Sequence, residues 1–366
     1  MSSGEFHRVK LRSLRVAGFQ YADSLTDTGG SINHLAKALR ITARSICLIL
    51  CTLTTAIAES GYEYFVTGNP ANVATQTAGL IVLQGGGDDV DENYVRMGEK
   101  AGGGDFVVFR ASGGDEYNEY IFELCACDSV ETLVFSKRDA SDEPFVLEKI
   151  RNAEALFVAD GDQSRYVRFW RGTPVEDAID QVVAKSAPVG GTSAGMAILG
   201  EFVYSAMSDN SLSAAIALQD PLHEDVTLAR DFLTVPVLKG IITDQHVKER
   251  GRTVALLARL VHDGWVSPGK AIAADRETAL HIDPVTGHAQ IYATGDHDTP
   301  YVWFMRTRGE PGEVRQSLPL SMRNIEVYRA GPGATFDLAA WSGAGGIAYT
   351  LSVERGTLTS SRTDIY

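Results

Sequence analysis

The stretch Gly190-Gly191-Thr192-Ser193-Ala194-Gly195 decides how this chain is organised. A short apolar run, 187–189, leads into it, and small residues suited to a helix follow over 194–199. The pattern Gly-x-Ser-x-Gly between a strand and a helix is that of a nucleophile elbow, a sharp turn that exposes a serine hydroxyl. Glycine is needed on both flanks because a Cβ atom would collide with the tight turn. The pattern therefore predicts Ser193 as a nucleophile; the alternative is a glycine-rich turn that merely starts a helix.

Apolar segments and helix-like segments alternate from about residue 79 onward. The apolar segments of β type are 80–83, 106–109, 132–135, 156–158 and 188–189. The helix-like stretches between them lie near 93–101, 115–125, 143–152 and 175–185. This alternation predicts an α/β fold with a mostly parallel sheet flanked by helices. Ligands gather at the carboxyl ends of strands in such sheets, and Ser193 directly follows one.

Composition excludes several classes of function. The chain has 366 residues, of which 44% are hydrophobic and 22% are charged, as in ordinary globular proteins. A net charge of -14 offers no overall basic surface, so nucleic acid is not an expected partner. The loop Asp296-His297-Asp298 lacks a second cluster at ligand spacing, and we expect neither a metal nor a cofactor. Gly85-Gly86-Gly87 lacks the third glycine of a dinucleotide fingerprint and is expected to form a tight turn at the rim of the site.

The first 58 residues have the pattern of a secretory leader. A positive flank with Arg40 and Arg44 precedes the apolar run 45–53, and Ala56-Ile57-Ala58 resembles a cleavage site. The run is too short and too often interrupted by threonine to span a membrane. We therefore expect a leader over 1–58, cleavage near Ala58, a secreted (periplasmic or extracellular) protein, and no stable membrane insertion of the mature form. A buried helix of the fold is the alternative.

The rest of the chain divides at about residue 285. The part over 59–285 carries the α/β pattern, and 286–366 reads as a β-rich C-terminal extension, with short β segments separated by glycine and proline. The extension either covers a sheet edge or contributes to a homodimer contact. Cys125 and Cys127 are separated by one residue, which would strain a disulfide, so we expect buried thiols or an incidental pair.

A second group of candidate residues is Asp244-Gln245-His246, which ends the strand-like segment 241–243. His246 is expected on the same rim as Ser193. A serine hydroxyl is a weak nucleophile until a base takes its proton, and histidine is the usual base near neutral pH. His246 is therefore the predicted general base; the alternative is a helix N-terminal histidine bonded to local backbone. Arg250 lies one turn further on the same helix face, and Arg252 is turned away from it.

These motifs, taken in order, resemble cyanophycinases and their relatives, including dipeptidase E. The matching segments are LFVADGDQ over 156–163, GGTSAG over 190–195, DQHVKERGR over 244–252 and AIAADRETAL over 271–280. The resemblance covers roughly residues 79–285. It implies a fold similar to class I glutamine amidotransferases and a serine exopeptidase without a cofactor. The typical substrate of that family is cyanophycin, a polyaspartate that bears arginine and is released as β-Asp-Arg dipeptides.

The resemblance also implies roles for single residues. Ser193 would be the nucleophile, His246 the general base, and the backbone N–H groups of Gly161 and Ala194 the oxyanion hole. The side chains implied to line the substrate site are those of Gln163, Asp244, Gln245, Arg250 and Arg252. Such a site suits the substrate, because carboxylates need cations and an arginine needs a carboxylate partner.

The chain also departs from the family pattern. Asp160 stands where glycine is usual, Val247 replaces an aromatic residue, and Ala255 falls where a third arginine is common. The family places an acid about fifteen to eighteen residues after the serine, and Asp209 is the acid in that window that we expect to orient the histidine. A turn-forming role of Asp209 in the polar loop 208–211 is the alternative.

Three hypotheses of function follow. The first is a secreted serine exopeptidase that hydrolyses cyanophycin or related β-aspartyl peptides, with a Ser-His-acid mechanism and a peptide or polymer as its partner. The second is an α/β-hydrolase-type esterase, which shares the Gly-x-Ser-x-Gly turn but leaves Asp244-Gln245-His246 unexplained. The third is a non-catalytic binding protein on the same scaffold, an alternative that the departures at Asp160 and Ala255 leave open.

Overall fold

The computed structural model describes residues 61–208, 212–294, 300–308 and 314–366. All described residues lie in one compact unit, 59–366. The predicted leader lies outside the described residues and stays a prediction. Within the described ranges, no helix has the length and apolar character that a membrane crossing needs.

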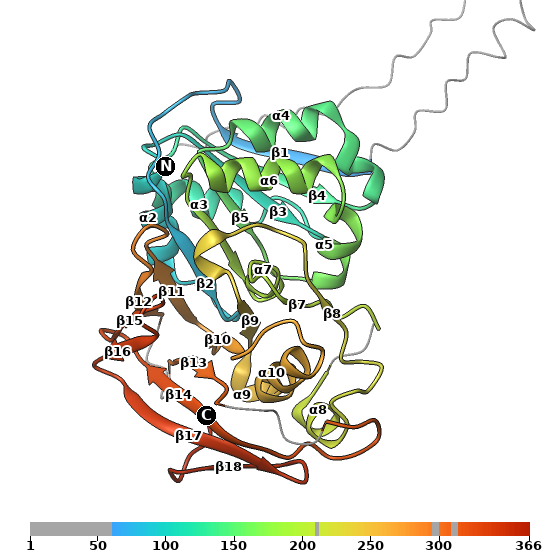
Figure 1. Ribbon diagram of the computed structural model, residues 1–366. Coiled ribbons are helices and arrows are strands. Elements are labelled where there is room, and N and C mark those ends of the chain that lie inside the picture. Colours follow the sequence, from blue (N-terminus) through green and yellow to red (C-terminus); the bar gives the residue numbers. More distant parts are fainter. Residues whose placement is uncertain (1–60, 209–211, 295–299, 309–313) are drawn as a thin grey trace, which may run out of the picture. The chain divides into compact units, whose positions relative to one another are not determined.

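A mixed sheet whose central strands are parallel forms the centre of the described unit, which confirms the predicted α/β fold (Figure 1). The sheet has ten strands in the order β1-β4-β3-β5-β6-β2-β11-β12-β15-β16. Its parallel strands are β2 (Ile81–Gln84), β3 (Asp105–Arg110), β4 (Ser129–Phe135), β5 (Ala155–Val158) and β6 (Val189–Thr192). These strands overlap the five predicted apolar segments, because strands covered on both faces are apolar along their length.

Helices cover both faces of the parallel strands. One face packs on α2 (Asp91–Lys100) and α3 (Asn118–Cys125). The other packs on α4 (Pro144–Asn152), α5 (Gln163–Trp170), α6 (Pro174–Ala184) and α7 (Ala194–Ile198). Five of these helices match the predicted stretches, α7 among them; α5 does not, and its start is set by the Asp162 carboxylate, which accepts the Ser164 N–H.

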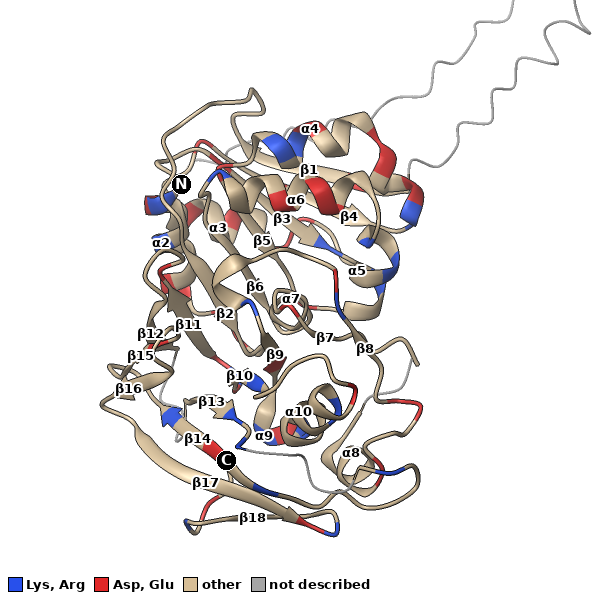
Figure 2. Ribbon diagram, in the orientation of Figure 1, with Lys and Arg blue, Asp and Glu red and all other residues tan. Residues whose placement is uncertain are grey.

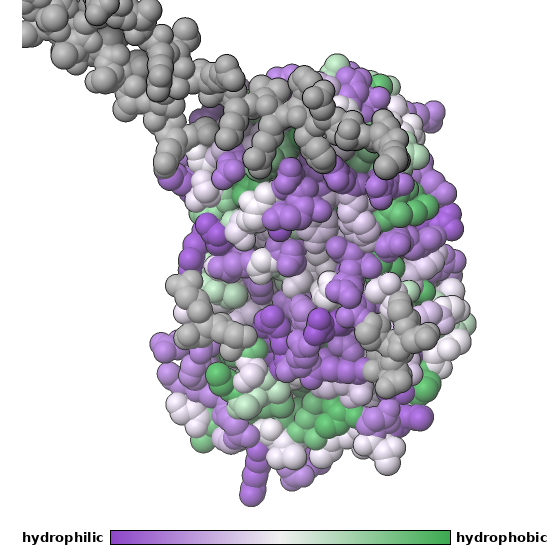
Figure 3. All heavy atoms as spheres, turned by 180° about the vertical axis from the view of Figure 1, so that it is seen from behind, coloured by the Kyte–Doolittle hydropathy of each residue, from purple (hydrophilic) through white to green (hydrophobic). Residues whose placement is uncertain are grey.

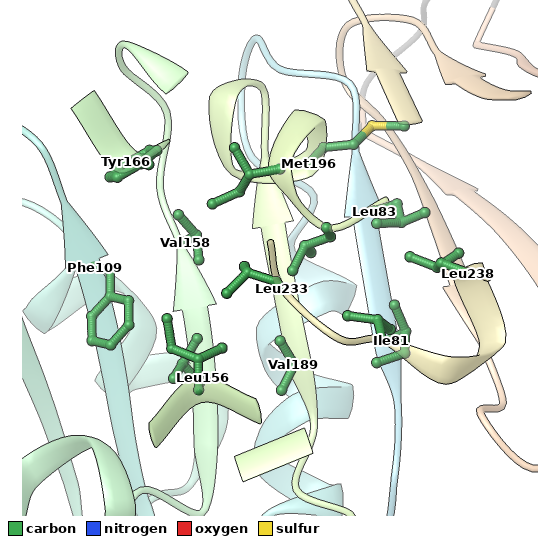
Figure 4. Close-up of a cluster of buried hydrophobic side chains, with 14 of the residues drawn as sticks. Ile81, Leu83, Phe109, Leu156, Val158, Tyr166, Val189, Met196, Leu233 and Leu238 are labelled. Atoms are coloured by element: carbon green, nitrogen blue, oxygen red, sulfur yellow. The ribbon is translucent and has the colours of Figure 1, made fainter. Parts of the chain in front are cut away.

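Alternate side chains of each strand enter opposite cores. Leu83, Leu156 and Val158 belong to the same buried cluster as Met196 of α7, and Leu233 and Leu238 from a later segment join it (Figure 4). Each such buried aliphatic side chain contributes roughly 1.5–3 kcal/mol relative to an exposed one. This packing fixes the position of α7, and with it the turn that carries Ser193.

A second sheet lies beside the first and has the order β18-β17-β14-β13-β10-β9. Its parallel pair is β9 (Ile241–Gln245) and β10 (Lys270–Ala274). Antiparallel strands extend it: β13 (Val302–Arg306), β14 (Met322–Ala330), β17 (Ile347–Glu354) and β18 (Thr357–Ser360). Between β9 and β10 lie α9 (Val247–Arg250) and α10 (Thr253–His262).

The β-rich segment from residue 286 onward contributes to both sheets. In the ten-stranded sheet, β11 (Thr278–Ile282) pairs with β12 (His288–Ala293), so hydrogen bonds cross the predicted boundary at residue 285. The remaining strands of this sheet are β15 (Thr335–Asp337), β16 (Ser342–Ala344) and, at the other edge, β1 (Tyr62–Gly68). The homodimer contact stays a prediction.

The segment between β6 and β9 contains short elements that connect the two sheets. They are β7 (Val203–Tyr204), α8 (Ala214–Gln219), β8 (Leu228–Ala229) and a 3-10 turn, η2 (Pro236–Leu238). Another 3-10 turn, η1 (Arg138–Asp142), precedes α4. Charged residues lie mainly on the covering helices and loops, whereas β5, β6 and β2 carry none (Figure 2). Hydrophilic residues dominate the face of the molecule seen from behind (Figure 3).

The two cysteines at the end of α3 are joined by a disulfide, Cys125–Cys127. The expectation of buried thiols or an incidental pair is therefore wrong. Ala126, the residue between them, has a left-handed backbone with φ 50°. This conformation turns the chain back on itself, so that the two side chains meet.

Candidate active site

Ser193 and His246 meet although their strands belong to different sheets. The Ser193 Oγ atom lies 3.1 Å from the His246 Nε2 atom. Ser193 directly follows β6 of the ten-stranded sheet, and His246 directly follows β9 of the six-stranded sheet. The expectation that both residues lie on the rim of one sheet is therefore wrong. The two carboxyl-terminal strand ends converge from neighbouring sheets instead.

Ser193 lies on a sharply turned backbone. Its φ of 50° and ψ of −110° are rare for a residue with a side chain, and such conformations cost about 1–3 kcal/mol. A Cβ atom on Gly191 would overlap the backbone of Gly195, and one on Gly195 would overlap the carbonyl of Val158. Both glycines are therefore required by the close approach of α7 to β5 and β6. This is the geometry of a nucleophile elbow.

The glycine loop 85–87 positions both halves of the site. The Ser193 N–H donates to the carbonyl of Gln84 at 3.0 Å, and the His246 N–H donates to the carbonyl of Gly85 at 3.1 Å. Gly86, with φ +97°, packs so closely under the histidine that a Cβ atom there would overlap the imidazole ring. The loop bends at 86–88 and lies against His246, where the sequence placed a tight turn.

The surroundings of His246 favour the neutral form of its imidazole. Burial lowers the pKa of its imidazole, and the Arg250 guanidinium lowers it further, whereas the Glu249 carboxylate raises it. The His246 Nδ1 atom is buried and makes no hydrogen bond within the described part of the chain. The nearby Glu249 Oε2 atom lies 3.4 Å from it. The signal for this contact was present in the sequence, since residues three apart on a helix are neighbours.

Asp244 and Arg252 bind each other. The Asp244 Oδ1 atom accepts hydrogen bonds from Arg252 Nη2 at 2.8 Å and from Arg252 Nε at 3.1 Å, and Oδ2 accepts one from the Thr253 hydroxyl at 2.7 Å. Both members of the pair are fully buried, and the Arg252 guanidinium also stacks on the Tyr204 ring. In this structure neither side chain is presented to a substrate, and the pair fixes the end of β9 to the start of α10.

The other side chains implied to bind substrate have different environments. Gln163 is buried and donates to the Tyr204 carbonyl at 3.3 Å. Gln245 is also buried, and its Oε1 atom has no hydrogen-bond partner among the described residues. Arg250 is half-buried, and no described residue forms an ion pair with it. Burial and the Arg252 guanidinium lower its pKa. Arg250 is thus the cation near His246 that is available to a ligand.

The two N–H groups predicted for the oxyanion hole lie at the ends of neighbouring parallel strands. Ala194 is the first residue of α7, so its N–H has no partner inside the helix. Gly161 follows β5, which pairs with β6, and has φ +138°. The Tyr166 hydroxyl holds this loop by hydrogen bonds to the carbonyls of Ala159 and Asp160.

Two predictions fall on residues outside the described ranges. They are Asp209, the acid expected to orient the histidine, and the loop 296–298. The first stays a prediction. Within the ranges that the structure does describe, no group of three His, Cys, Asp or Glu side chains is arranged to hold a metal ion.

Comparisons with known proteins agree with the resemblance. Residues 116–220 match the model of peptidase family S51. The cyanophycinases of Synechococcus elongatus and Thermosynechococcus vestitus are each 24% identical over an alignment of 278 residues, and this alignment covers 71% of this chain and 79% of each relative. The similarity to cyanophycinases and to family S51 is therefore confirmed, and it supports a hydrolase of the peptidase class.

Two solved structures are also similar in part. A peptidase from an acI-B1 actinobacterium has a TM-score of 0.48 and 16% identity, covering 72% of this chain and 98% of that one. A putative peptidase E protein from Listeria monocytogenes has a TM-score of 0.40 and 14% identity, covering 59% of this chain and 99% of that one.

Proposed function

We propose that this protein is a serine peptidase in which Ser193 is the nucleophile and His246 the general base. The observation that carries the proposal is the 3.1 Å contact between the Ser193 hydroxyl and the His246 Nε2 atom, at a turn with the geometry of a nucleophile elbow. The base takes the hydroxyl proton while the oxygen attacks the scissile carbonyl. It then gives this proton to the leaving amine, and water releases the acyl group by the same route.

The environment of the two residues suits this chemistry. Burial lowers the pKa of His246, so its imidazole is neutral and able to accept a proton at neutral pH. The N–H groups of Ala194 and Gly161 are the proposed donors to the oxyanion of the tetrahedral intermediate. Donors of this kind, fixed before the reaction, are typically the largest contribution to acyl transfer.

The proposed substrate is cyanophycin or a related β-aspartyl peptide, cleaved as by an exopeptidase. The support is the similarity to two proteins named cyanophycinase and the position of Arg250, a half-buried cation beside His246 that suits a substrate carboxylate. A substrate arginine would find a carboxylate at Asp160, which is exposed at the loop that carries Gly161. We further propose secretion after cleavage near Ala58, on the leader pattern of residues 1–58.

The test is hydrolysis of cyanophycin by the purified protein, with β-Asp-Arg detected by mass spectrometry. Replacement of the nucleophile, Ser193→Ala, should lower turnover by at least about 1,000-fold, as loss of a catalytic serine does elsewhere. Ser136→Ala, at an exposed serine directly after β4, is the matched control and should leave turnover unchanged. Full hydrolysis by Ser193→Ala would disprove the mechanism. Release of p-nitrophenol from acyl esters without any peptide cleavage would instead support the esterase hypothesis.

A further inference from the structure

The Nδ1 side of His246 has an acidic neighbour on its own helix. A neutral imidazole that takes a proton at Nε2 must carry its own proton on Nδ1, and this N–H needs an acceptor that holds the ring in place. The Nδ1 atom is buried and has no hydrogen bond in the described ranges, while the Glu249 Oε2 atom lies 3.4 Å away. A small rotation of the carboxylate brings this separation into hydrogen-bond range, and such contacts often tighten only when substrate binds.

The other oxygen of the same carboxylate is held by a different part of the fold. The Arg276 Nη1 atom lies 3.3 Å from Glu249 Oε1, which leaves Oε2 for the histidine. Arg276 belongs to the turn between β10 and β11, and the next residue, Glu277, donates its N–H to the Gly86 carbonyl at 2.6 Å. Gly86 in turn lies against the imidazole ring. The arginine, the carboxylate and the ring are therefore fixed by one connected set of contacts.

We infer that Glu249 is the positioning residue of the site: its carboxylate accepts the Nδ1–H of His246, and Arg276 orients that carboxylate. This inference rests on the proposed roles of Ser193 and His246. The family resemblance gives this role to an acid shortly after the serine, which is Asp209 here. Our inference gives the role to Glu249, three positions after the histidine. Glu249 does not touch the substrate; it acts through the ring.

The charged groups around the ring make the assignment testable by pH. Glu249 and Arg250 come from α9, Arg252 from the start of α10, and Arg276 from the β10–β11 turn; the glycine loop faces the ring with backbone only. Glu249 raises the pKa of His246, whereas Arg276 lowers it. Removing the charge of Glu249 should therefore move the acidic limb of a pH–rate profile to lower pH. Removing the charge of Arg276 should move this limb to higher pH.

The experiment measures how fast a fluorophosphonate labels Ser193, followed by intact mass in the full-length protein between pH 5 and pH 9. This probe reports on the serine and its base without requiring the correct peptide, so an error in the proposed substrate does not affect it. Glu249→Gln should slow labelling about 10- to 100-fold, less than loss of a buried triad aspartate, because this carboxylate is half exposed. Glu249→Asp should restore part of the rate.

Two further variants separate positioning from general damage. Arg276→Met should slow labelling less than Glu249→Gln and shift the acidic limb in the opposite direction. Glu123→Gln, at an exposed glutamate on α3, is the matched control for loss of one negative charge and should match the wild-type protein.

The outcomes distinguish this inference from the proposed function. Wild-type protein that does not react with the probe would overturn the serine mechanism and the role of Glu249 together. If the wild type reacts and Glu249→Gln reacts equally fast, the role of Glu249 is disproved and the serine mechanism stands. The same holds if the acidic limb of the Glu249→Gln profile stays where it is in the wild type. If Asp209→Asn labels much more slowly than the wild type while Glu249→Gln labels at the wild-type rate, Asp209 is the acid that orients His246.

Discussion

His246 is partly buried and His281 is buried, and burial is the main cause that lowers the pKa of each, yet only His246 has the surroundings of a catalytic base. His246 lies at a strand end with a left-handed φ of 50°, and its Nε2 atom faces a hydroxyl on a strained turn. His281 lies within β11, its Nε2 atom donates to the Asn93 Oδ1 atom at 2.7 Å, and its ring packs on Tyr292. A lowered histidine pKa thus indicates that the ring is shielded from water. Whether the histidine suits catalysis depends on which group its Nε2 atom contacts.

The two histidines are connected through one strand. Asn93, the partner of His281, also donates to the Gln84 Oε1 atom at 2.5 Å, and all three side chains are buried. Gln84 ends β2, and its backbone carbonyl accepts the Ser193 N–H. The satisfied network around His281 therefore stiffens the strand that leads into the glycine loop beneath His246.

The largest expected difference lies in what supports each ring. The ring of His281 is held by the neutral side-chain amide of Asn93. His246 lies two residues after Asp244, whose carboxylate forms a buried ion pair with Arg252. We expect Asp244→Asn to lower the free energy of unfolding by about 3–5 kcal/mol, because it leaves the Arg252 charge buried without a counterion. Urea denaturation at pH 7 measures this. Arg252→Met in the same background should recover part of the loss, and an unchanged midpoint in Asp244→Asn would contradict the importance of the pair.

A second difference appears in the pH dependence of stability. Burial lowers the pKa of His281 to about 3. Below the ordinary histidine pKa of about 6.5 the unfolded chain takes up a proton there and the folded protein does not, so the free energy of unfolding should fall by about 3 kcal/mol between pH 6.5 and pH 4. Denaturation of the wild type and of His281→Gln across this range should show that the variant lacks this part of the slope. Parallel curves would mean that His281 is protonated in the folded protein.

The smallest expected effect concerns the contact between Gly86 and the ring of His246. A methyl group in Gly86→Ala would overlap the imidazole, displace it from Ser193 and slow fluorophosphonate labelling about 10- to 100-fold, or about 1.4–2.7 kcal/mol in activation free energy. Gly240→Ala is the matched control, because Gly240 also has a positive φ but a methyl group there would meet no described atom within 4 Å. Equal labelling rates in the two variants would show that the glycine loop does not position the base.

Several parts of the fold could be predicted because their signals are local. The five apolar segments became strands β2 to β6, and five of the helix-like stretches became helices. Helix α5 was missed although Asp162, a residue type that favours a helix start, precedes it, because residues 156–163 were assigned to the family motif LFVADGDQ. The disulfide between Cys125 and Cys127 was missed because it depends on a left-handed residue between them, which sequence spacing does not reveal.

By itself, the sequence determined the elbow around Ser193, since only glycine tolerates the close approach of α7 to the sheet, and it placed His246 at a strand end. Only the tertiary structure decided that this strand belongs to a second sheet and that Asp244 is bound to Arg252. The physical reason is the range of the interactions. Glycine requirements and apolar periodicity act between neighbours in the chain, whereas strand partners and buried charge pairs are chosen by packing between distant segments.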